Sequence, residues 1–195
     1  MKTIKTNDDL IPVSRFIGES ERNIEIANVI YEQYEDARED ILRGFFERLA
    51  AGLKAKLPDW SSRYTEAFFT TRYGAFDLFK SAWLERYTIR VEAYDWGHGV
   101  IYGVWRDAES LHNIPLNAKL FSTVKGKFPQ TTSRAYYEAE IPMLSPAKDW
   151  RTPNALWRVH SDDKFRAEVE SLLLEIANLT EAQIDLMVKK QKSAK

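Results

Sequence analysis

The feature that most constrains this chain is a long stretch without proline, from residue 20 to residue 56. Apolar residues recur in it at spacings of three and four, at Ile24, Ala27, Tyr31, Tyr34, Ile41, Phe45 and Leu49. This spacing places them on one face of a helix. Ser20 suits the N-cap, and Pro58 forbids helical continuation. An unbroken helix here would be about 54 Å long at 1.5 Å per residue, more than a domain of this size spans.

We therefore expect the helix either to break or to project its N-terminal half onto another molecule. The stripe repeats nearer every 3.5 residues than every 3.6, which is typical of a coiled-coil-like contact. Arg38 stands where the stripe needs an apolar residue. We predict that the chain binds another protein, or itself as a homo-oligomer, through this helix. The predicted partner-binding residues are Tyr31, Tyr34, Arg38 and Trp60.

After Pro58 the apolar pattern changes to a period of two, which is typical of strands. The alternation predicts strands at residues 64–71, 75–83, 86–96 and 100–106, with a fifth strand or extended segment at 133–141. Between the third and fourth strands lies Gly97-His98-Gly99. Two glycines in so short a connection permit the positive φ angles of a tight turn. We interpret this stretch as a β-hairpin.

The remaining segments complete an α+β domain. Residues 1–19 read as a flexible arm, and 115–129 as a short helix. Residues 155–159 read as a short strand or docking segment. One helix is expected after Ser161, and a second after Thr180, where "TEAQ" resembles a capping box. We predict a single domain at 20–195: a long N-terminal helix, an antiparallel four- to five-strand meander sheet, and C-terminal helices packed on one face.

Composition removes several classes of function. The net charge is -1, which disfavours a dedicated duplex-DNA binder with a broad basic field. The absence of cysteine excludes thiolate nucleophiles and cysteine-based metal centres. The sequence has no phosphate-binding glycine motif, no HExxH and no GxSxG. We predict no catalytic residue, metal or cofactor. With no apolar stretch of membrane-spanning or signal length, we expect a soluble, cytoplasmic protein.

Two other interpretations stay open. Sheet arginines and tryptophans are suited to binding single-stranded nucleic acid, the candidates being Arg90, Trp96, Trp105 and Arg106. Interleaved glutamates favour a solvated sheet face instead. Alternatively, Asp95 could orient His98 as a base in an undeclared enzyme site, although no nucleophile is specified nearby. Asp77 and Lys80 resemble the acid and lysine of a metal-dependent nuclease site. We do not predict such a site, because strand alternation places the two residues on opposite faces of the sheet.

The order of several motifs resembles a known family. "LPDW", the hairpin "VEAYDWGHGVIYGVWRD" and the later "SPAKDWRTPNALWRV" precede a final amphipathic helix. This order resembles the C-terminal accessory region of bacterial and phage PD-(D/E)XK nuclease family proteins, over roughly residues 35 to 180. The nuclease core, with its metal-binding acids and lysine, is missing, so no catalytic residue is carried over. The resemblance implies a phage or mobile-element protein that modulates a host nucleic-acid-processing or defence complex.

Overall fold

The structure is a computed structural model, and it describes residues 7–66, 68, 71, 73–83, 86–94, 99–106, 135–140, 150 and 152–193. The helices are α1 (Asn7–Gly18), α2 (Glu21–Lys56), α4 (Pro153–Ser161) and α5 (Asp163–Ser193), with a 3-10 helix η1 (Ser81–Trp83). The strands are β1 (Trp60–Tyr64), β2 (Tyr73–Lys80), β3 (Tyr87–Tyr94), β4 (Gly99–Arg106) and β5 (Ala135–Glu140). The chain divides into two compact units, Met1–Arg38 and Glu39–Lys195, and α2 contributes to both.

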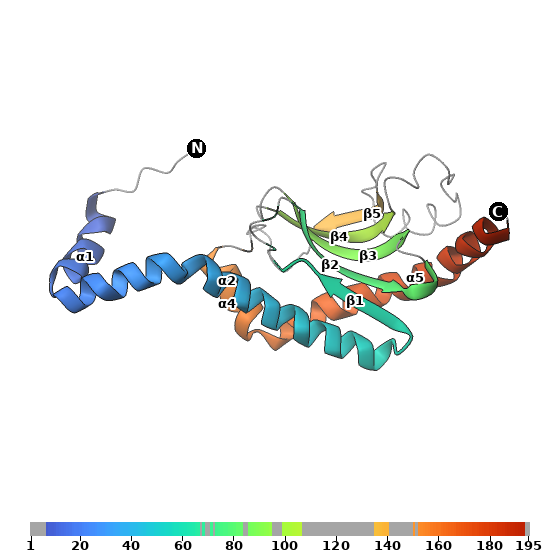
Figure 1. Cartoon of the computed structure of the whole chain (residues 1–195), viewed down its shortest axis with the longest axis horizontal. Coiled ribbons are helices and arrows are strands. Elements are labelled where there is room, and N and C mark those ends of the chain that lie inside the picture. Colours follow the sequence, from blue (N-terminus) through green and yellow to red (C-terminus); the bar gives the residue numbers. More distant parts are fainter. Residues whose placement is uncertain are drawn as a thin grey trace. The chain divides into compact units, whose positions relative to one another are not determined.

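The second unit is built on an antiparallel sheet in which sequence neighbours pair, in the order β1-β2-β3-β4-β5 (Figure 1). This confirms the predicted α+β fold with a meander sheet. The predicted hairpin is present, because β3 and β4 pair from Tyr87↔Arg106 to Tyr94↔Gly99. Its connection, residues 95–98, lies outside the described residues.

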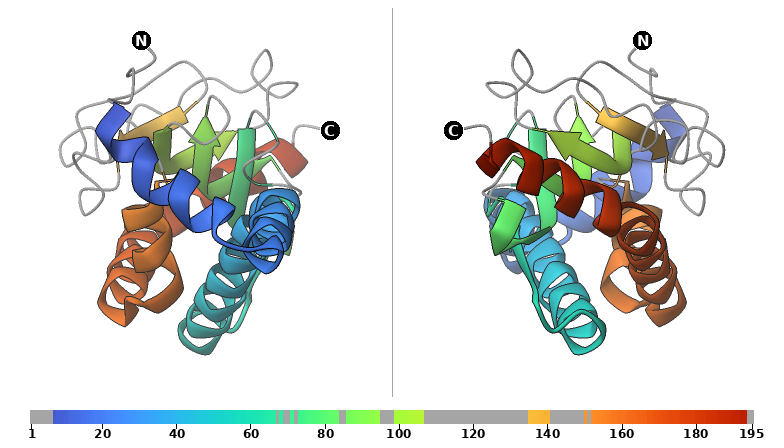
Figure 2. Two further views of the ribbon diagram at one scale, coloured as in Figure 1. Left: turned by 90° about the vertical axis from the view of Figure 1, so that its left-hand side faces the viewer. Right: turned by 90° about the vertical axis from the view of Figure 1, so that its right-hand side faces the viewer.

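The core of this unit lies between one sheet face and the helices. Figures 1 and 2 show the C-terminal half of α2, together with α4 and α5, on the same side of the sheet. Strand β3 buries alternate residues on that face, from Tyr87 to Ala93. Phe45 of α2 meets Trp150 and Phe165, with ring centroids 5.7 Å from each. Aromatic residues from distant parts of the sequence thus form the centre of the core.

Helix α5 is fixed to the end of β2 by a partly buried polar cluster. Lys80 Nζ donates to Asp185 Oδ2 at 2.8 Å and to Glu181 Oε1 at 2.9 Å. The indole of Trp83 donates to the other oxygen of Asp185 at 2.7 Å. The hydrogen bond to Asp185 raises the pKa of Lys80, and Glu181 adds to this increase, so the net shift is upward although burial opposes it. The cluster determines where α5 meets the sheet.

Two N-terminal predictions were wrong. Residues 7–18 form helix α1 and not an irregular arm. The helix tolerates Pro12, which removes only one hydrogen bond in its first half. The first strand also begins earlier than predicted, at Trp60. The Trp60 N–H donates to the Leu57 carbonyl at 3.0 Å, so a tight turn carries the chain straight from helix to strand.

Two C-terminal predictions were also wrong. Residues 153–161 form helix α4, because Thr152 accepts the Ala155 N–H and Pro153 occupies the first turn. Helix α5 runs unbroken through Thr180, whose hydroxyl donates to the Ile176 carbonyl and is fully buried. The true cap of α5 is Asp162, which accepts the N–H groups of Lys164 and Phe165. The predicted helix at 115–129 lies outside the described residues.

Candidate interaction surface

The first unit carries a run of exposed apolar side chains, which we name the N-terminal apolar surface. Its members are Val13, Phe16, Ile24, Ile26, Val29, Ile30, Tyr31 and Tyr34. Tyr31 is 86% exposed and Ile30 is 59% exposed. Elsewhere in the described part of the chain, the exposed large hydrophobic residues are Trp157 and Leu186. Exposed apolar area is therefore concentrated in the first unit, which is typical of an interaction site.

The junction between α1 and α2 is fixed by short-range hydrogen bonds. The Ser20 hydroxyl accepts the Asn23 N–H at 3.2 Å, as an N-cap does. The Asn23 side chain reaches back and donates to the Phe16 carbonyl at 2.6 Å, near the end of α1. These contacts join the two helices at a defined corner (Figure 1). A surface held in advance loses less conformational entropy when it binds.

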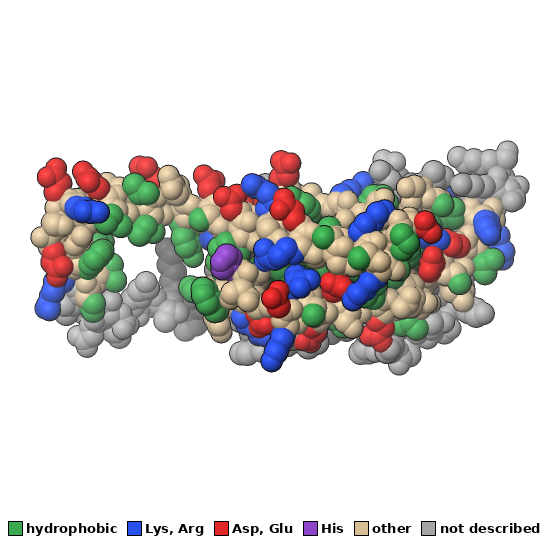
Figure 3. Space-filling view, turned by 90° about the horizontal axis from the view of Figure 1, so that it is seen from below, with side chains coloured by type: hydrophobic (Ala, Val, Ile, Leu, Met, Phe, Trp, Pro, Cys, Tyr) green, Lys and Arg blue, Asp and Glu red, His purple; other side chains and the backbone are tan. Residues whose placement is uncertain are grey.

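Several carboxylates of α2 in this unit lie on the side of the helix away from Tyr31 and Tyr34. Glu25, Glu32 and Asp36 are spaced by seven and four residues, so they share a helix face opposite to that of Tyr31 and Tyr34. In Figure 3 acidic side chains line one edge of this helical segment. The face that carries Tyr31 and Tyr34 is consequently free of this carboxylate row, whereas Val29, four residues after Glu25 and three before Glu32, lies beside it.

Three of the four predicted partner-binding residues lie in this unit. Tyr31 and Tyr34 belong to the N-terminal apolar surface. Arg38 is buried, with its guanidinium 2.7 Å from Glu35 and 5.3 Å from the Tyr34 ring centre. The ion pair explains how arginine is tolerated in the apolar stripe. Trp60 departs from the prediction: it is 3% exposed, packs edge-on against Trp83 and does not belong to the N-terminal apolar surface.

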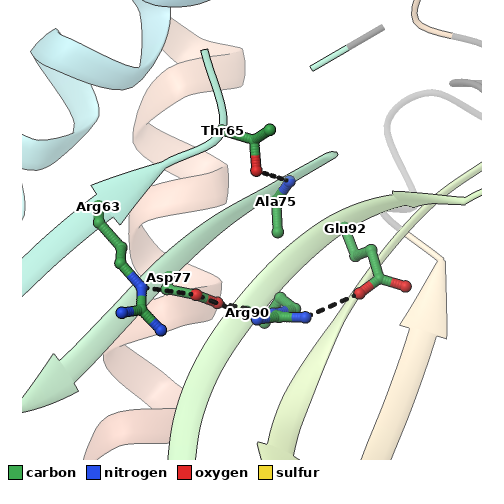
Figure 4. A network of polar contacts seen from close by, with 6 residues as sticks. All are labelled: Arg63, Thr65, Ala75, Asp77, Arg90 and Glu92. Carbon is green, nitrogen blue, oxygen red and sulfur yellow. Dashed lines mark hydrogen bonds and ion pairs between the residues drawn. The ribbon is translucent and has the colours of Figure 1, made fainter. Parts of the chain in front are cut away.

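The sheet arginines form a charge-balanced network (Figure 4). Arg63, Asp77 and Arg90 are register neighbours across β1, β2 and β3. Arg90 Nε donates to Asp77 Oδ1 at 2.6 Å, and another of its nitrogens donates to Glu92 at 3.1 Å. Arg63 donates to Asp77 at 3.2 Å. Two guanidinium groups thus face two carboxylates.

This network bears on the proposed nucleic-acid candidates. Burial lowers the pKa of Arg90, but Asp77 and Glu92 outweigh it and the net shift is upward. The guanidinium also lies 5.9 Å from the Trp105 ring centre. Three of its N–H directions point at carboxylates and not at solvent, so Arg90 is poorly placed to bind phosphate. Asp77 and Lys80 have separate partners, consistent with the opposite faces expected for them.

The remaining candidates belong to the connection between β3 and β4 and to the end of β4. Asp95, Trp96 and His98 lie outside the described residues, and Arg106 is described only as the last residue of β4. Within the described ranges, no group of three or more His, Asp or Glu side chains is arranged to hold a metal ion. No helix in that part of the chain is long and apolar enough to cross a bilayer.

Comparison with known proteins gives no further guide, because no family model, curated protein or solved structure matches this chain. The resemblance to a nuclease accessory region therefore depends on its motif order alone.

Proposed function

We propose that this chain is a non-enzymatic protein-interaction module that docks on its partner through the N-terminal apolar surface. The partner is another protein or a second copy of the chain. Helix α2 contributes residues to both units, so the surface belongs to the same helix as part of the packed core. The motif order discussed above adds a setting to this proposal: a phage or bacterial protein in the cytoplasm that modulates a host nucleic-acid-processing or defence complex.

The observation that carries the proposal is the exposure of eight large apolar residues within one short unit. Ile30, Tyr31 and Tyr34 share one face of α2 at spacings of three and four, so they can enter one interface together. Tyrosine supplies large contact area with little loss of side-chain entropy, so Tyr31 and Tyr34 are expected to dominate binding.

The experiment is affinity capture of the tagged full chain from its native cells, with and without nuclease treatment, read by mass spectrometry. The test variant is Ile30→Ala/Tyr31→Ala/Tyr34→Ala. The matched control is Glu25→Ala/Glu32→Ala, which makes the same type of change on the acidic face. We expect the test variant to capture at least about tenfold less of a stoichiometric partner than the wild type does. Truncating an anchor residue lowers the binding free energy by about 2 kcal/mol or more. The control should retain that partner.

Sedimentation of the purified chain separates the two kinds of partner. A dimer that the test variant abolishes makes the partner a second copy; a monomer that still captures a protein makes the partner another chain. Capture unchanged by the triple variant would refute docking through this surface.

The nucleic-acid alternative has its own outcome in the same experiment. Loss of every partner after nuclease treatment would make nucleic acid the ligand, and binding to single strands should then weaken steeply with salt. The ion pairs of Arg90 argue against this outcome. An enzyme site at Asp95 and His98 would be tested by His98→Ala once an activity is known.

A further inference from the structure

A hollow of about 390 Å³ opens in the second unit where the end of α2 lies over β1. It is lined by Ala50, Ala51, Leu53, Lys54, Leu57, Trp60, Ser61, Ser62 and Leu78. Ser62 lies on the core-facing side of β1, opposite Leu78 in the register. Its neighbours on that side, Trp60 and Tyr64, are aromatic. The hollow exists because a small side chain stands where large ones would fill the layer.

Strand β1 is an edge of the sheet formed by the described strands. The Thr65 N–H donates to the Ala75 carbonyl at 2.9 Å, so residues 61, 63 and 65 direct their backbone groups toward β2. Residues 60, 62 and 64 therefore direct theirs outward. The Trp60 groups are already used: its N–H donates to Leu57, and its carbonyl accepts from Lys54. Among the described residues, the outward backbone groups of Ser62 and Tyr64 have no hydrogen-bond partner.

An added strand would place one side chain in the hollow. A residue opposite Ser62 projects to the same face of the sheet as Ser62 itself. That face is where Leu53 and Leu78 line the hollow. The backbone pairing and the hollow therefore serve one ligand. This combination, in which main-chain bonds give affinity and a pocket gives specificity, is how strand addition recognises peptides.

Charge at the hollow favours an acidic ligand. Lys54 Nζ donates to the carbonyls of Pro58 at 2.6 Å and Trp60 at 3.0 Å. These two bonds hold the ammonium at the rim of the hollow. An ammonium carries three N–H groups, so one is left for a carboxylate.

We propose that the β1 edge binds an extended peptide as an added strand. One apolar side chain of the peptide enters the hollow, and a neighbouring carboxylate pairs with Lys54. The ligand class is a short acidic-apolar peptide segment of another protein. This site is separate from the N-terminal apolar surface and stands or falls independently of it.

The test uses a displayed library of random heptapeptides, selected on the full-length chain. The dissociation constant of an enriched peptide is then measured for the wild type and four variants. Ser62→Leu fills the hollow, Ser62→Pro removes the outward N–H, and Lys54→Met removes the charge. Ser171→Ala is the control, because Ser171 is an exposed residue of α5 and is not among the residues that line the hollow. Thermal unfolding of each variant checks that it is folded.

We expect enriched peptides to pair an apolar residue with an acidic one. Both Ser62 variants should weaken binding at least tenfold. Lys54→Met should weaken it severalfold and remove the acidic preference, and Ser171→Ala should leave it within twofold. Amide exchange at Ser62 and Tyr64 should slow when the peptide is bound.

Three results would overturn the proposal. The first is that no peptide binds more tightly than about 1 mM. The second is that enriched peptides bind a folded Ser62→Leu variant as tightly as the wild type. The third is that the chain self-associates and Ser62→Pro abolishes that association, because the occupant of the edge would then be a second copy.

Discussion

The two halves of α2 make an instructive comparison, because one helix passes through two environments. In Glu39–Lys56 the residues Leu42, Phe45, Phe46, Leu49 and Leu53 are at most 1% exposed. In Glu21–Arg38 the apolar residues Ile24, Ile30, Tyr31 and Tyr34 are 44% to 86% exposed. The apolar spacing hardly differs between the halves. Periodicity therefore identifies which face of a helix is apolar, but only the rest of the fold determines whether that face is covered.

The sharpest way to break this comparison is to truncate one aromatic residue in each half. Phe45→Ala should lower the free energy of unfolding by about 3–5 kcal/mol, because the ring contacts Phe46, Trp150 and Phe165 in a filled core. Tyr31→Ala should change it by no more than about 0.5 kcal/mol. Urea denaturation of both variants measures the difference. A cost above about 1 kcal/mol for Tyr31→Ala would show that the N-terminal half is also packed.

The same contrast explains what the sequence predicted well. The alternation at 86–96 correctly predicted a strand, because it depends only on the pleat, and the structure buries Ile89 and Val91 on one face of β3. The helix at 20–56 was found from its spacing alone. Trp60 was predicted to bind a partner but is buried. The sequence around a tryptophan that follows a proline turn fits an exposed residue and the first residue of a buried strand equally well. Its burial depends on Trp83, which local pattern does not reveal.

Short-range signals near the C-terminus were misread for a similar reason. Thr152-Pro153 is a strong helix start, but the apolar residues after it also fit a strand. Thr180 imitates a cap, yet the surrounding residues Ile176 and Ile184 are fully packed and carry the helix through it. Tertiary burial overrode a local cap signal there. The hollow beside Ser62 left no sequence signal, since it depends on how α2 crosses β1.

A second prediction concerns the two glycines in the packed half of α2. A Cβ at Gly52 would collide with the Glu170 carboxylate, lying 2.9 Å from its Cδ. Glu170 is buried and paired with Lys56 at 2.7 Å, so it cannot move freely. We expect Gly52→Ala to cost about 1–3 kcal/mol, despite the better helix propensity of alanine.

Gly44 is the matched control. A Cβ there lies 3.3 Å from the guanidinium of Arg48, the far end of an exposed and flexible side chain. Gly44→Ala should therefore be neutral or stabilise by about 0.5–1 kcal/mol. Urea denaturation compares the two variants. Equal effects at the two positions would refute the close approach of α2 and α5 at Gly52.

A third prediction tests the polar cluster between β2 and α5 by pH. Burial raises the pKa of Asp185, but hydrogen bonds from Lys80 and Trp83 outweigh burial and the net shift is downward. A carboxylate with a lowered folded-state pKa stabilises the fold above its ordinary pKa, and this contribution disappears as the pH falls through the folded value. At neutral pH, Asp185→Asn should cost about 1 kcal/mol, after allowance for partial exposure.

The difference between wild type and Asp185→Asn should shrink below about pH 4, the ordinary range of an aspartate pKa. Lys80 gives the opposite pH dependence, because its pKa is raised on folding. Its contribution to the free energy of unfolding is present at neutral pH and disappears only when the pH rises above 10.5. Urea denaturation between pH 3 and pH 8 measures the acid limb. The exposed Asp163, changed to Asn, is the control for the substitution itself, because its carboxylate is not part of the cluster with Lys80 and Trp83. A constant difference across the range would contradict the proposed charge pairing.

The smallest expected effect comes from removing one helix cap in each of the two units. Thr152 caps α4 in the packed unit, and Ser20 caps α2 in the exposed one. Thr152→Ala should lower the free energy of unfolding by about 0.5–1 kcal/mol, because α4 unfolds with the core. Ser20→Ala should leave that free energy unchanged, because the first turns of α2 can fray without exposing any buried side chain.

Amide hydrogen exchange gives the measurement for Ser20. The Asn23 and Ile24 amides, which hydrogen-bond to the Ser20 side chain and carbonyl, should exchange severalfold faster in Ser20→Ala. Ser20→Asp should restore slow exchange, because aspartate is an equally good N-cap. If Ser20→Ala instead lowers the global stability as much as Thr152→Ala does, the N-terminal half of α2 unfolds together with the core. Its apolar face would then belong to the packed fold and would not be held ready for a partner.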